Sequence, residues 1–191
     1  MIDTTQLVEI RWHGRGGQGA VTSAELLARA AINEGKYAQA FPSFGPERRG
    51  APVLAFDRIS PREPIRVRAD VAEPDVVIVL DPTLLRIIKV TSGLKDNGVL
   101  VVNTTKSMAD IEAEFGTKWT LATLDATRIA REELGVPIAN TTMLGALLRA
   151  TGVVDRESLA EPLQQRFNRL AERNIKAMTR AFEETVVKER G

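Results

Sequence analysis

The sequence predicts an α/β fold: a doubly wound, mostly parallel, Rossmann-like sheet with a small strand excursion and a helical C-terminal third. Three observations support this prediction. A glycine-rich segment joins an alternating apolar run to an alanine-rich helical pattern. Two uninterrupted apolar runs, DVVIVL at 75–80 and GVLVVN at 98–103, are typical of strands covered on both faces. Strand and helix patterns alternate around these runs, which favours parallel crossover units.

The first part of the chain starts with a strand at 6–12, where apolar and polar residues alternate. A helix follows from about Ala20 to Gly35, a residue suited to the C-terminal cap. The run KYAQAF predicts a short second strand, which leads into a loop rich in proline and glycine. Two later runs, VLAFDRIS at 53–60 and IRVRA at 65–69, predict the strand excursion as an antiparallel pair.

The middle of the chain alternates between strands and helices. After the apolar strand at 75–80, DPTLLRIIKVTSGL predicts a helix over 81–94, with Asp81 as N-cap and Pro82 in the first turn. The elements expected next are a strand at 98–103, a helix at 107–116, a strand at 118–125 and a helix at 126–135. This alternation is typical of a doubly wound sheet.

The last third changes to helices without an intervening strand. Residues 140–188 predict C-terminal helices, the first capped by Asn140, packed on a single domain that spans 1–191. Apolar side chains recur there on or near one helix face: Leu163, Phe167, Leu170, Met178, Phe182 and Val186. Such a stripe is typical of core packing, and a docking face for another subunit is the alternative. Basic residues of the last helix predict a solvated face: Arg166, Arg169, Arg173 and Arg180.

Composition excludes several classes of function. Lys and Arg total 26 against 25 Asp and Glu, so the net charge of +1 gives no reason to expect nucleic acid or an anionic membrane as partner. No apolar run approaches the roughly 18 residues of a membrane-spanning helix, and no signal-peptide pattern is visible, so a cytoplasmic location is expected. Because the chain has no cysteine, it has no thiolate ligands for zinc or iron–sulfur clusters. Its single histidine, His13, also disfavours a histidine-based metal site, so no metal ligand is expected.

The segment RWHGRGGQGAVTSAELL holds the most informative motif. Gly14, Gly16 and Gly19 fit the pattern G-x-G-x-x-G, with Gly17 as an extra glycine, between a strand and a helix. The missing side chains let the backbone approach a phosphate, and the helix that begins near Ala20 directs its free N–H groups at the same point. The alternative is that the glycines only allow tight packing between strand and helix.

An NAD site is disfavoured, because its fingerprint requires an acidic residue after the second strand and none occurs before Glu47. Arg48 and Arg49 follow directly, so this loop suits either an anion or salt bridges. The stretches LDPT at 80–83 and VVNTT at 101–105 end strands at the carboxyl edge, where open sheets bind ligands, and both also suit helix caps. No nucleophile, general base or thiamine diphosphate motif is recognisable, so we expect binding without catalysis.

The chain resembles the gamma subunit of 2-oxoacid:ferredoxin oxidoreductases, the pyruvate enzyme most of all. The resemblance is carried by RWHGRGGQGAVTSAELLARAA, KYAQAFPSFGPERRGAPVLAF, PDVVIVLDPTLL, VLVVNTT and NTTMLGALLRATG. It runs from about residue 8 to about residue 185. The combination of G-x-G-G-Q-G with YAQAFPSFGPERRGAP is its most specific part.

The resemblance implies a non-catalytic subunit of a multi-subunit complex. Such a complex oxidatively decarboxylates a 2-oxoacid such as pyruvate with coenzyme A, giving acyl-CoA, carbon dioxide and reduced ferredoxin. The implied partners are alpha-, beta- and delta-type subunits, which hold the thiamine diphosphate, Mg²⁺ and [4Fe–4S] clusters, together with ferredoxin or another electron acceptor. The gamma-type domain is implicated in forming the coenzyme A site.

The glycine-rich motif and the family resemblance both lead to the hypothesis of a shared coenzyme A site. Its expected residues are His13, Gly14, Gly16, Gly17, Gln18, Gly19, Arg48 and Arg49. The pyrophosphate and 3′-phosphate of coenzyme A suit a helix N-terminus and arginines, and its ribose needs no carboxylate. For His13, a purely structural hydrogen-bonding role is the alternative. For the chain, the alternatives are a structural bridge between catalytic subunits, an NAD-dependent oxidoreductase, or the same complex with an aromatic or branched-chain 2-oxoacid and another acceptor.

Overall fold

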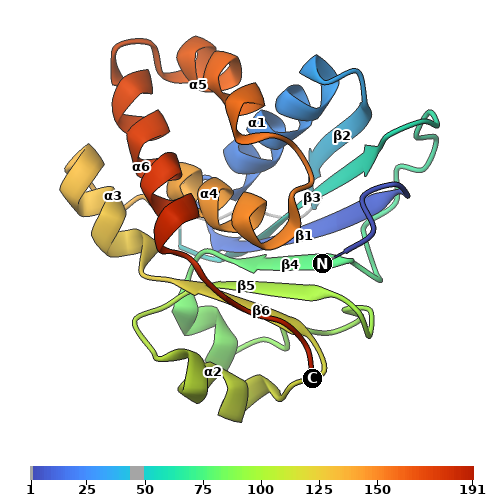
Figure 1. Ribbon diagram of the computed structural model, residues 1–191, viewed down its shortest axis with the longest axis vertical. Helices are drawn as coiled ribbons and strands as arrows, with labels where there is room; N and C mark the ends of the chain where they lie inside the picture. Colours follow the sequence, from blue (N-terminus) through green and yellow to red (C-terminus); the bar gives the residue numbers. More distant parts are fainter. Residues whose placement is uncertain (1, 44–49) are drawn as a thin grey trace.

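Seven strands form one sheet in the computed structural model, which describes residues 2–43 and 50–191 (Figure 1). The strands are β1 (Val8–Arg15), β2 (Tyr37–Pro42), β3 (Pro52–Ser60), β4 (Val76–Val79), β5 (Val99–Asn103), β6 (Thr120–Leu124) and β7 (Val186–Lys188). Their order in space is β2-β3-β1-β4-β5-β6-β7. All point the same way except β3 and β7, which are antiparallel to their neighbours. The predicted mostly parallel sheet is thus confirmed.

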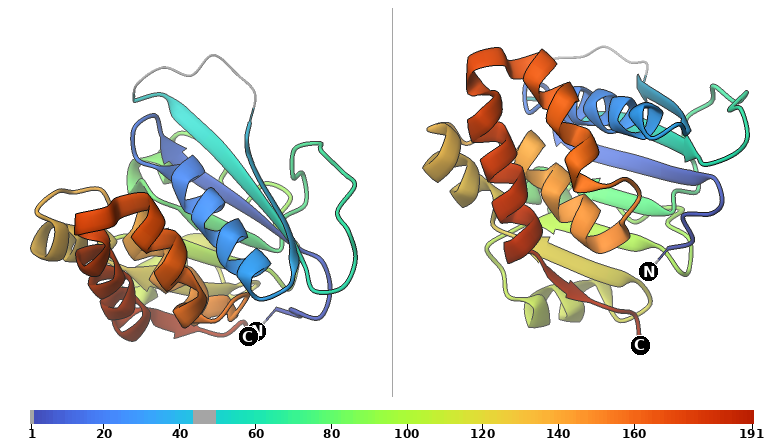
Figure 2. Two further views of the ribbon diagram at one scale, coloured as in Figure 1. Left: turned by 90° about the horizontal axis from the view of Figure 1, so that it is seen from above. Right: turned by 45° about the horizontal axis from the view of Figure 1, so that its top comes forward.

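Helices cover both faces of this sheet, as a doubly wound fold requires. The α-helices are α1 (Ala20–Asn33), α2 (Met108–Phe115), α3 (Ala126–Leu134), α4 (Asn140–Thr151), α5 (Ala160–Phe167) and α6 (Ala171–Glu184). Short 3-10 helices are η1 (Pro82–Arg86), η2 (Arg156–Leu159) and η3 (Asn168–Leu170). Figures 1 and 2 show α1, α4, α5 and α6 on one face and α2 on the other. No described helix is long and apolar enough to cross a membrane.

Each face of the sheet has its own hydrophobic core. The larger core lies under α1 and α4 and includes the fully buried side chains of Trp12 and Ile78. The smaller core lies on the α2 side and includes Val77 and Val79. Because adjacent residues of a strand point to opposite faces, the uninterrupted apolar run of β4 supplies both cores. This explains why that run contains no polar residue.

The predicted strand at 65–69 is wrong. β3 pairs with β1 on one side and β2 on the other, so it has no free edge for a further strand. The carbonyls of the 65–69 segment pair with side chains instead. Arg58 donates to the Val67 and Ala69 carbonyls at 3.3 and 2.8 Å, and Gln39 donates to the Ile65 carbonyl at 2.9 Å.

The predicted helix over 81–94 is also wrong beyond its first turn. Asp81 caps η1 as expected, since its carboxylate accepts from the Thr83 backbone N–H at 2.9 Å, and Pro82 lies in the first turn. The helical pattern then stops at Arg86. The segment that follows is rich in β-branched residues, which lower helix propensity. Its Val90 is buried in the smaller core, so tertiary packing determines the conformation there.

The C-terminal third is mostly helical but departs from the prediction in three places. Asn168, at a φ of 46°, breaks the long helix into α5 and α6. β7 adds an antiparallel strand to β6, where only helix was expected. Asn140 is the first residue of α4, and its side chain does not cap the helix.

In the predicted apolar stripe, Leu163 and Met178 are buried, whereas Leu170 and Val186 are more than half exposed.

A buried carboxyl group in the larger core leads to a prediction about pH. Asp57 on β3 is fully buried; one of its oxygens accepts from Trp12 Nε1 at 2.6 Å, and the other has no partner among the described residues. Burial raises the pKa of Asp57 well above its usual range, although the Trp12 hydrogen bond acts in the opposite direction. The native state therefore holds this proton at pH values where the unfolded chain has lost it.

We expect the Asp57 contribution to stability to fall as pH rises above about 4, the pKa of an unfolded aspartate. Asp57→Asn removes this contribution because an amide does not titrate. The difference in thermal midpoint between the variant and the wild type should shift in favour of the variant from pH 5 to pH 8. A difference that is the same at both pH values would contradict the raised pKa.

Candidate functional site

The glycine-rich turn lies where the chain reverses its direction across the sheet. β1 and β4 are neighbours, but α1 leads from β1 toward one edge, while the strands after β4 lead to the other. In open α/β sheets, ligands bind outside the carboxyl ends of the strands at such a switch point. The residues after β1, at 16–19, and those after β4, at 80–82, meet at this place.

Asp81 holds the turn in place. Gln18 accepts from the Arg15 backbone N–H at 2.8 Å and donates its side-chain amide to Asp81 Oδ2 at 2.7 Å. Arg15 Nε donates to the same oxygen at 3.1 Å, and its other nitrogens reach the Gly50 carbonyl and the Thr83 hydroxyl. Burial alone raises the pKa of Asp81, but hydrogen bonds from Thr83 and Gln18 outweigh it and hold the pKa below its ordinary value. The ionised Asp81 is balanced by Arg15.

The glycines of the turn differ in what they contact. Gly14 is buried in β1, where an added Cβ would lie 3.3 Å from Leu80 Cδ1, so the missing side chain allows close packing. Gly16 donates its N–H to the Ala51 carbonyl at 2.9 Å. Gly17 is exposed and has a φ of 93°. Gly19 also has positive φ, at 81°, and begins α1.

Two helices at this point begin without a local negative group. Among the described α-helices, only α1 and α4 lack both a side-chain cap and an acidic residue in the first turn. By contrast, α2 and α3, which follow β5 and β6, are capped by Ser107 and Asp125. The first N–H groups of a helix have no partner within it, and they carry partial positive charge. The beginnings of α1 and α4 are therefore suited to an anion.

A small pocket of about 180 Å³ lies between these two helix ends and the carboxyl ends of β4 and β5. Its lining includes Gln18, Leu80, Asp81, Asn103 and Asn140. Asn140 closely approaches Gly19, because a Cβ on that glycine would lie 2.5 Å from the Asn140 side-chain nitrogen. Asn140 is 7% exposed and lines the pocket, and no hydrogen bond joins its side-chain amide to another described residue. The pocket thus contains an amide donor without a partner among the described residues, in addition to the two helix ends.

His13 lies away from this pocket. Its neighbour Trp12 faces α1, so the His13 side chain is on the opposite face of the sheet, where Nε2 accepts from Arg11 Nε at 3.1 Å. Burial, together with the charge of Arg11, lowers the pKa of His13 to about 3. The imidazole is therefore neutral near pH 7, with its proton on Nδ1.

The structure brings together part of the predicted site. Gln18 and Gly19 lie at the pocket, Gly16 and Gly17 form the turn before them, and Arg48 and Arg49 lie outside the described residues. Sequence reasoning missed Asn140 as a pocket residue, because its position before a helix suggested only a cap. It also missed the link from Gln18 to Asp81, which no local pattern reveals.

Comparisons with known proteins agree with this architecture. The family model described as pyruvate ferredoxin/flavodoxin oxidoreductase matches residues 9–184. The chain is 55% identical over 185 residues to the pyruvate/ketoisovalerate oxidoreductases common subunit gamma of Thermococcus kodakarensis, covering 96% of this chain and 100% of that relative. The crystal structure of pyruvate oxidoreductase subunit PORC from Thermotoga maritima is similar, with a TM-score of 0.84 and 41% identity over 96% of this chain and 99% of that one.

A longer protein shares the fold. The structure of 2-oxoglutarate:ferredoxin oxidoreductase from Magnetococcus marinus, with 2-oxoglutarate, coenzyme A and succinyl-CoA bound, matches 93% of this chain with a TM-score of 0.74. Only 31% of that chain is covered, and the identity is 19%, so the likeness concerns the fold alone. The same fold therefore also occurs as one part of a larger polypeptide.

Proposed function

The chain belongs to the pyruvate ferredoxin/flavodoxin oxidoreductase family, and from this membership we propose that it is the gamma subunit of a 2-oxoacid oxidoreductase complex that helps to bind coenzyme A. In this proposal the pocket at the glycine-rich turn holds the pyrophosphate of coenzyme A. The observation that carries it is the meeting of two uncapped helix N-termini with the Asn140 amide, which has no hydrogen-bond partner among the described residues. The chain contributes binding, and the catalytic groups lie elsewhere in the complex.

The chemistry of the pocket fits a pyrophosphate better than a nucleoside. Backbone N–H groups at the starts of α1 and α4 are donors, and phosphate oxygens accept hydrogen bonds from such positions. Asn140 adds a side-chain donor. The Asp81 carboxylate is neutralised by Arg15 and bonded to Gln18, so it leaves little negative potential to repel an anion. When bound, coenzyme A supplies the thiol that accepts the acyl group, and the residues of this chain would position it.

The other components are proposed to lie on partner chains. Thiamine diphosphate, Mg²⁺ and [4Fe–4S] clusters would be held by alpha-, beta- and delta-type subunits, and ferredoxin or another acceptor would take the electrons. The absence of cysteine from the sequence supports this division, since clusters are held by cysteine thiolates. The overall reaction is the oxidative decarboxylation of a 2-oxoacid such as pyruvate.

The test is Asn140→Asp in the assembled complex. An aspartate at the start of α4 places a carboxylate among the N–H groups that would bind the phosphates, so we expect the Kd for coenzyme A to rise at least about tenfold. The same carboxylate interacts favourably with both helix dipoles, so the thermal midpoint should not fall. Calorimetric titration with coenzyme A and a thermal melt measure the two effects. A control, Asn97→Asp in the exposed turn before β5, should change neither.

An unchanged Kd for coenzyme A in Asn140→Asp would contradict the proposed contact. The second candidate function, a purely structural bridge between catalytic subunits, would then be favoured. One observation supports that candidate: Val136 and Ile138, between α3 and α4, are both 43% exposed beside the pocket. Serine at both positions would weaken assembly of the complex under the bridge hypothesis, while the kinetics of intact complexes would stay the same.

A further inference from the structure

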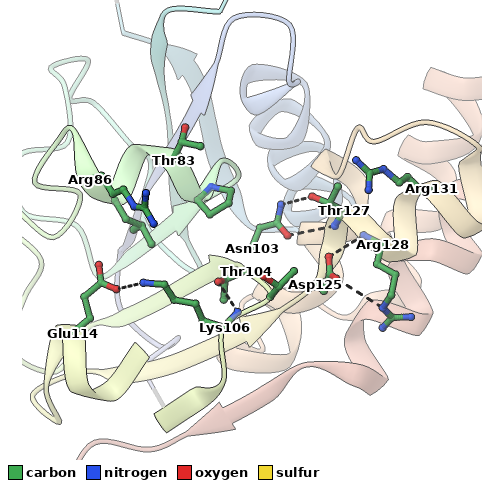
Figure 3. Close-up of a pocket in the computed structure, with 13 residues that line it drawn as sticks. Thr83, Arg86, Asn103, Thr104, Lys106, Glu114, Asp125, Thr127, Arg128 and Arg131 are labelled. Carbon is green, nitrogen blue, oxygen red and sulfur yellow. Dashed lines mark hydrogen bonds and ion pairs between the residues drawn. The ribbon is translucent and has the colours of Figure 1, made fainter. Parts of the chain in front are cut away.

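A larger pocket adjoins the one at the glycine-rich turn. It has a volume of about 480 Å³ and lies between η1, α2 and α3, at the carboxyl ends of β5 and β6 (Figure 3). The two pockets share Pro82, Asn103 and Thr127 in their linings, so they are neighbours along one edge of the sheet. Binding sites for small molecules typically measure about 300–1,000 Å³, and this pocket lies within that range.

The polar groups at its base are already bonded to one another. Asn103 donates to the Leu80 carbonyl at 2.8 Å and to the Thr127 hydroxyl at 2.9 Å, and its oxygen accepts from the Ala126 N–H at 3.0 Å. Asp125 accepts from the Arg128 N–H at 2.9 Å. The start of α3 is thus satisfied by the protein itself. Recognition in this pocket therefore depends on the charged side chains around it.

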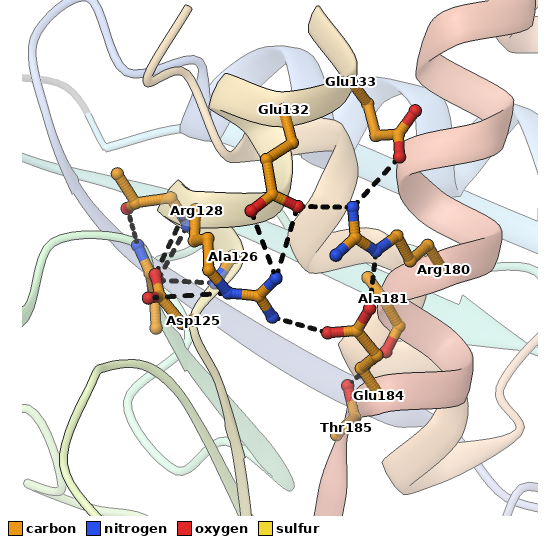
Figure 4. Close-up of polar contacts among 11 residues, drawn as sticks. Asp125, Ala126, Arg128, Glu132, Glu133, Arg180, Ala181, Glu184 and Thr185 are labelled. Atoms are coloured by element: carbon orange, nitrogen blue, oxygen red, sulfur yellow. Dashed lines mark hydrogen bonds and ion pairs between the residues drawn. The ribbon is translucent and has the colours of Figure 1, made fainter.

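Four cationic side chains line the pocket, and two of them are already engaged. Lys106 pairs with Glu114 at 2.6 Å. Arg128 pairs with Glu132 at 3.3 Å and with Glu184 at 2.6 Å, as Figure 4 shows. These two glutamates also bind Arg180 of α6, so the predicted solvated role of Arg180 is corrected to an ion-pair network between α3 and α6.

Arg86 and Arg131 are different. Arg86 lies on η1 and Arg131 on α3, and both line the pocket. Neither forms an ion pair or a side-chain hydrogen bond within the described residues, and neither is buried. Two exposed guanidinium groups without carboxylate partners among the described residues lie on opposite sides of one cavity in Figure 3, and this positive charge favours an anion inside it. A terminal phosphate, with a charge near −2, suits two such groups.

We propose that this pocket binds the 3′-phosphate of coenzyme A, contacted by Arg86 and Arg131. The inference rests on the proposed function, in which the smaller pocket takes the pyrophosphate. Because the two pockets share lining residues, a single ligand can place one phosphate-bearing part in each. The arginines then determine whether the complex prefers coenzyme A to its 3′-dephospho form.

The test compares binding of coenzyme A and 3′-dephospho-coenzyme A to the assembled complex by calorimetric titration. We expect the wild type to prefer coenzyme A by at least about tenfold, the contribution of one charge-assisted hydrogen bond. Arg86→Gln and Arg131→Gln should each reduce that preference, and the double variant should remove it. The Kd for the dephospho form should stay within about twofold in all variants. The control is Arg62→Gln, an exposed arginine beyond β3 at the opposite edge of the sheet.

Three results would overturn this inference: a wild type that does not discriminate, a preference that survives in the double variant, or an equal loss of affinity for both ligands. Impaired assembly with intact discrimination would instead assign the two arginines to acidic groups of a partner subunit. The two proposals fail separately. If Asn140→Asp leaves coenzyme A binding unchanged while the double arginine variant removes the preference, the pyrophosphate contact is wrong and the 3′-phosphate site stands.

Discussion

Arg11→Met is expected to lower the thermal midpoint of the chain by about 10 °C, a loss of about 4 kcal/mol in a protein of this size. Arg11 is 7% exposed and lies on β1. It donates to His13 Nε2 at 3.1 Å and to the Val90 carbonyl at 3.0 Å. It also donates to the Ser92 and Val71 carbonyls. A methionine would fill the space but leave these buried acceptors without donors, and each orphaned group costs about 1–3 kcal/mol.

Two further variants sharpen this prediction. Arg11→Lys should recover less than half of the loss, because an ammonium group cannot reproduce the planar fork that reaches several acceptors at once. Arg29→Met, an exposed position on α1 without an ion pair among the described residues, should shift the midpoint by no more than about 2 °C. A melt of Arg11→Met that coincides with that of the wild type would show that the buried guanidinium does not hold these segments together.

Gly145→Ala is expected to destabilise the protein by about 3 kcal/mol, against the usual preference of helices for alanine. Gly145 lies within α4, where the helix packs on α6. A Cβ at this position would come within 2.0 Å of the Met178 carbonyl oxygen and 2.9 Å of the Phe182 backbone nitrogen. Because backbone atoms cannot rotate away as a side chain can, the two helices must separate and leave voids in the larger core.

The direction of this effect is the test. Replacing glycine by alanine within a helix normally stabilises by about 1 kcal/mol, so a higher thermal midpoint would contradict the close approach of α4 and α6. Gly145→Ser should behave like Gly145→Ala, since its Cβ meets the same atoms. Denaturation monitored by circular dichroism measures the change, with the wild type under the same conditions as reference.

The sequence predicts correctly those elements that depend on interactions between residues close together in the chain. The apolar runs of β4 and β5, the uncapped start of α1 and the cap at Asp81 are all encoded within a few residues of sequence. The predictions failed where tertiary contacts override local preference. The 65–69 segment has strand-like residues, but two of its carbonyls accept hydrogen bonds from the Arg58 side chain. The 81–94 segment has helical spacing, but its helix stops at Arg86 and Val90 packs into the smaller core.

The candidate site was predicted only in part for the same reason. The glycine-rich turn is a contiguous motif, so its place after a strand and before a helix is visible in the sequence. Asn140 is more than a hundred residues away and reaches Gly19 only through the packing of α4 beside α1. Arg86 and Arg131 likewise meet one cavity because η1 and α3 follow different strands of the same sheet. Such convergence depends on topology, which single-sequence patterns do not specify.

The two outermost strands restrict how this protein can join others. β7 is only three residues long and ends in Lys188, which pairs with Glu112, while β2 ends in Pro42, a residue without an N–H to donate. Short margins, charge and proline discourage one polypeptide from extending the hydrogen-bonded ladder of another. We therefore expect assembly to proceed through side-chain complementarity on loops and helices. Dissociation of the subunit would then break no backbone hydrogen bonds of a sheet shared between two chains.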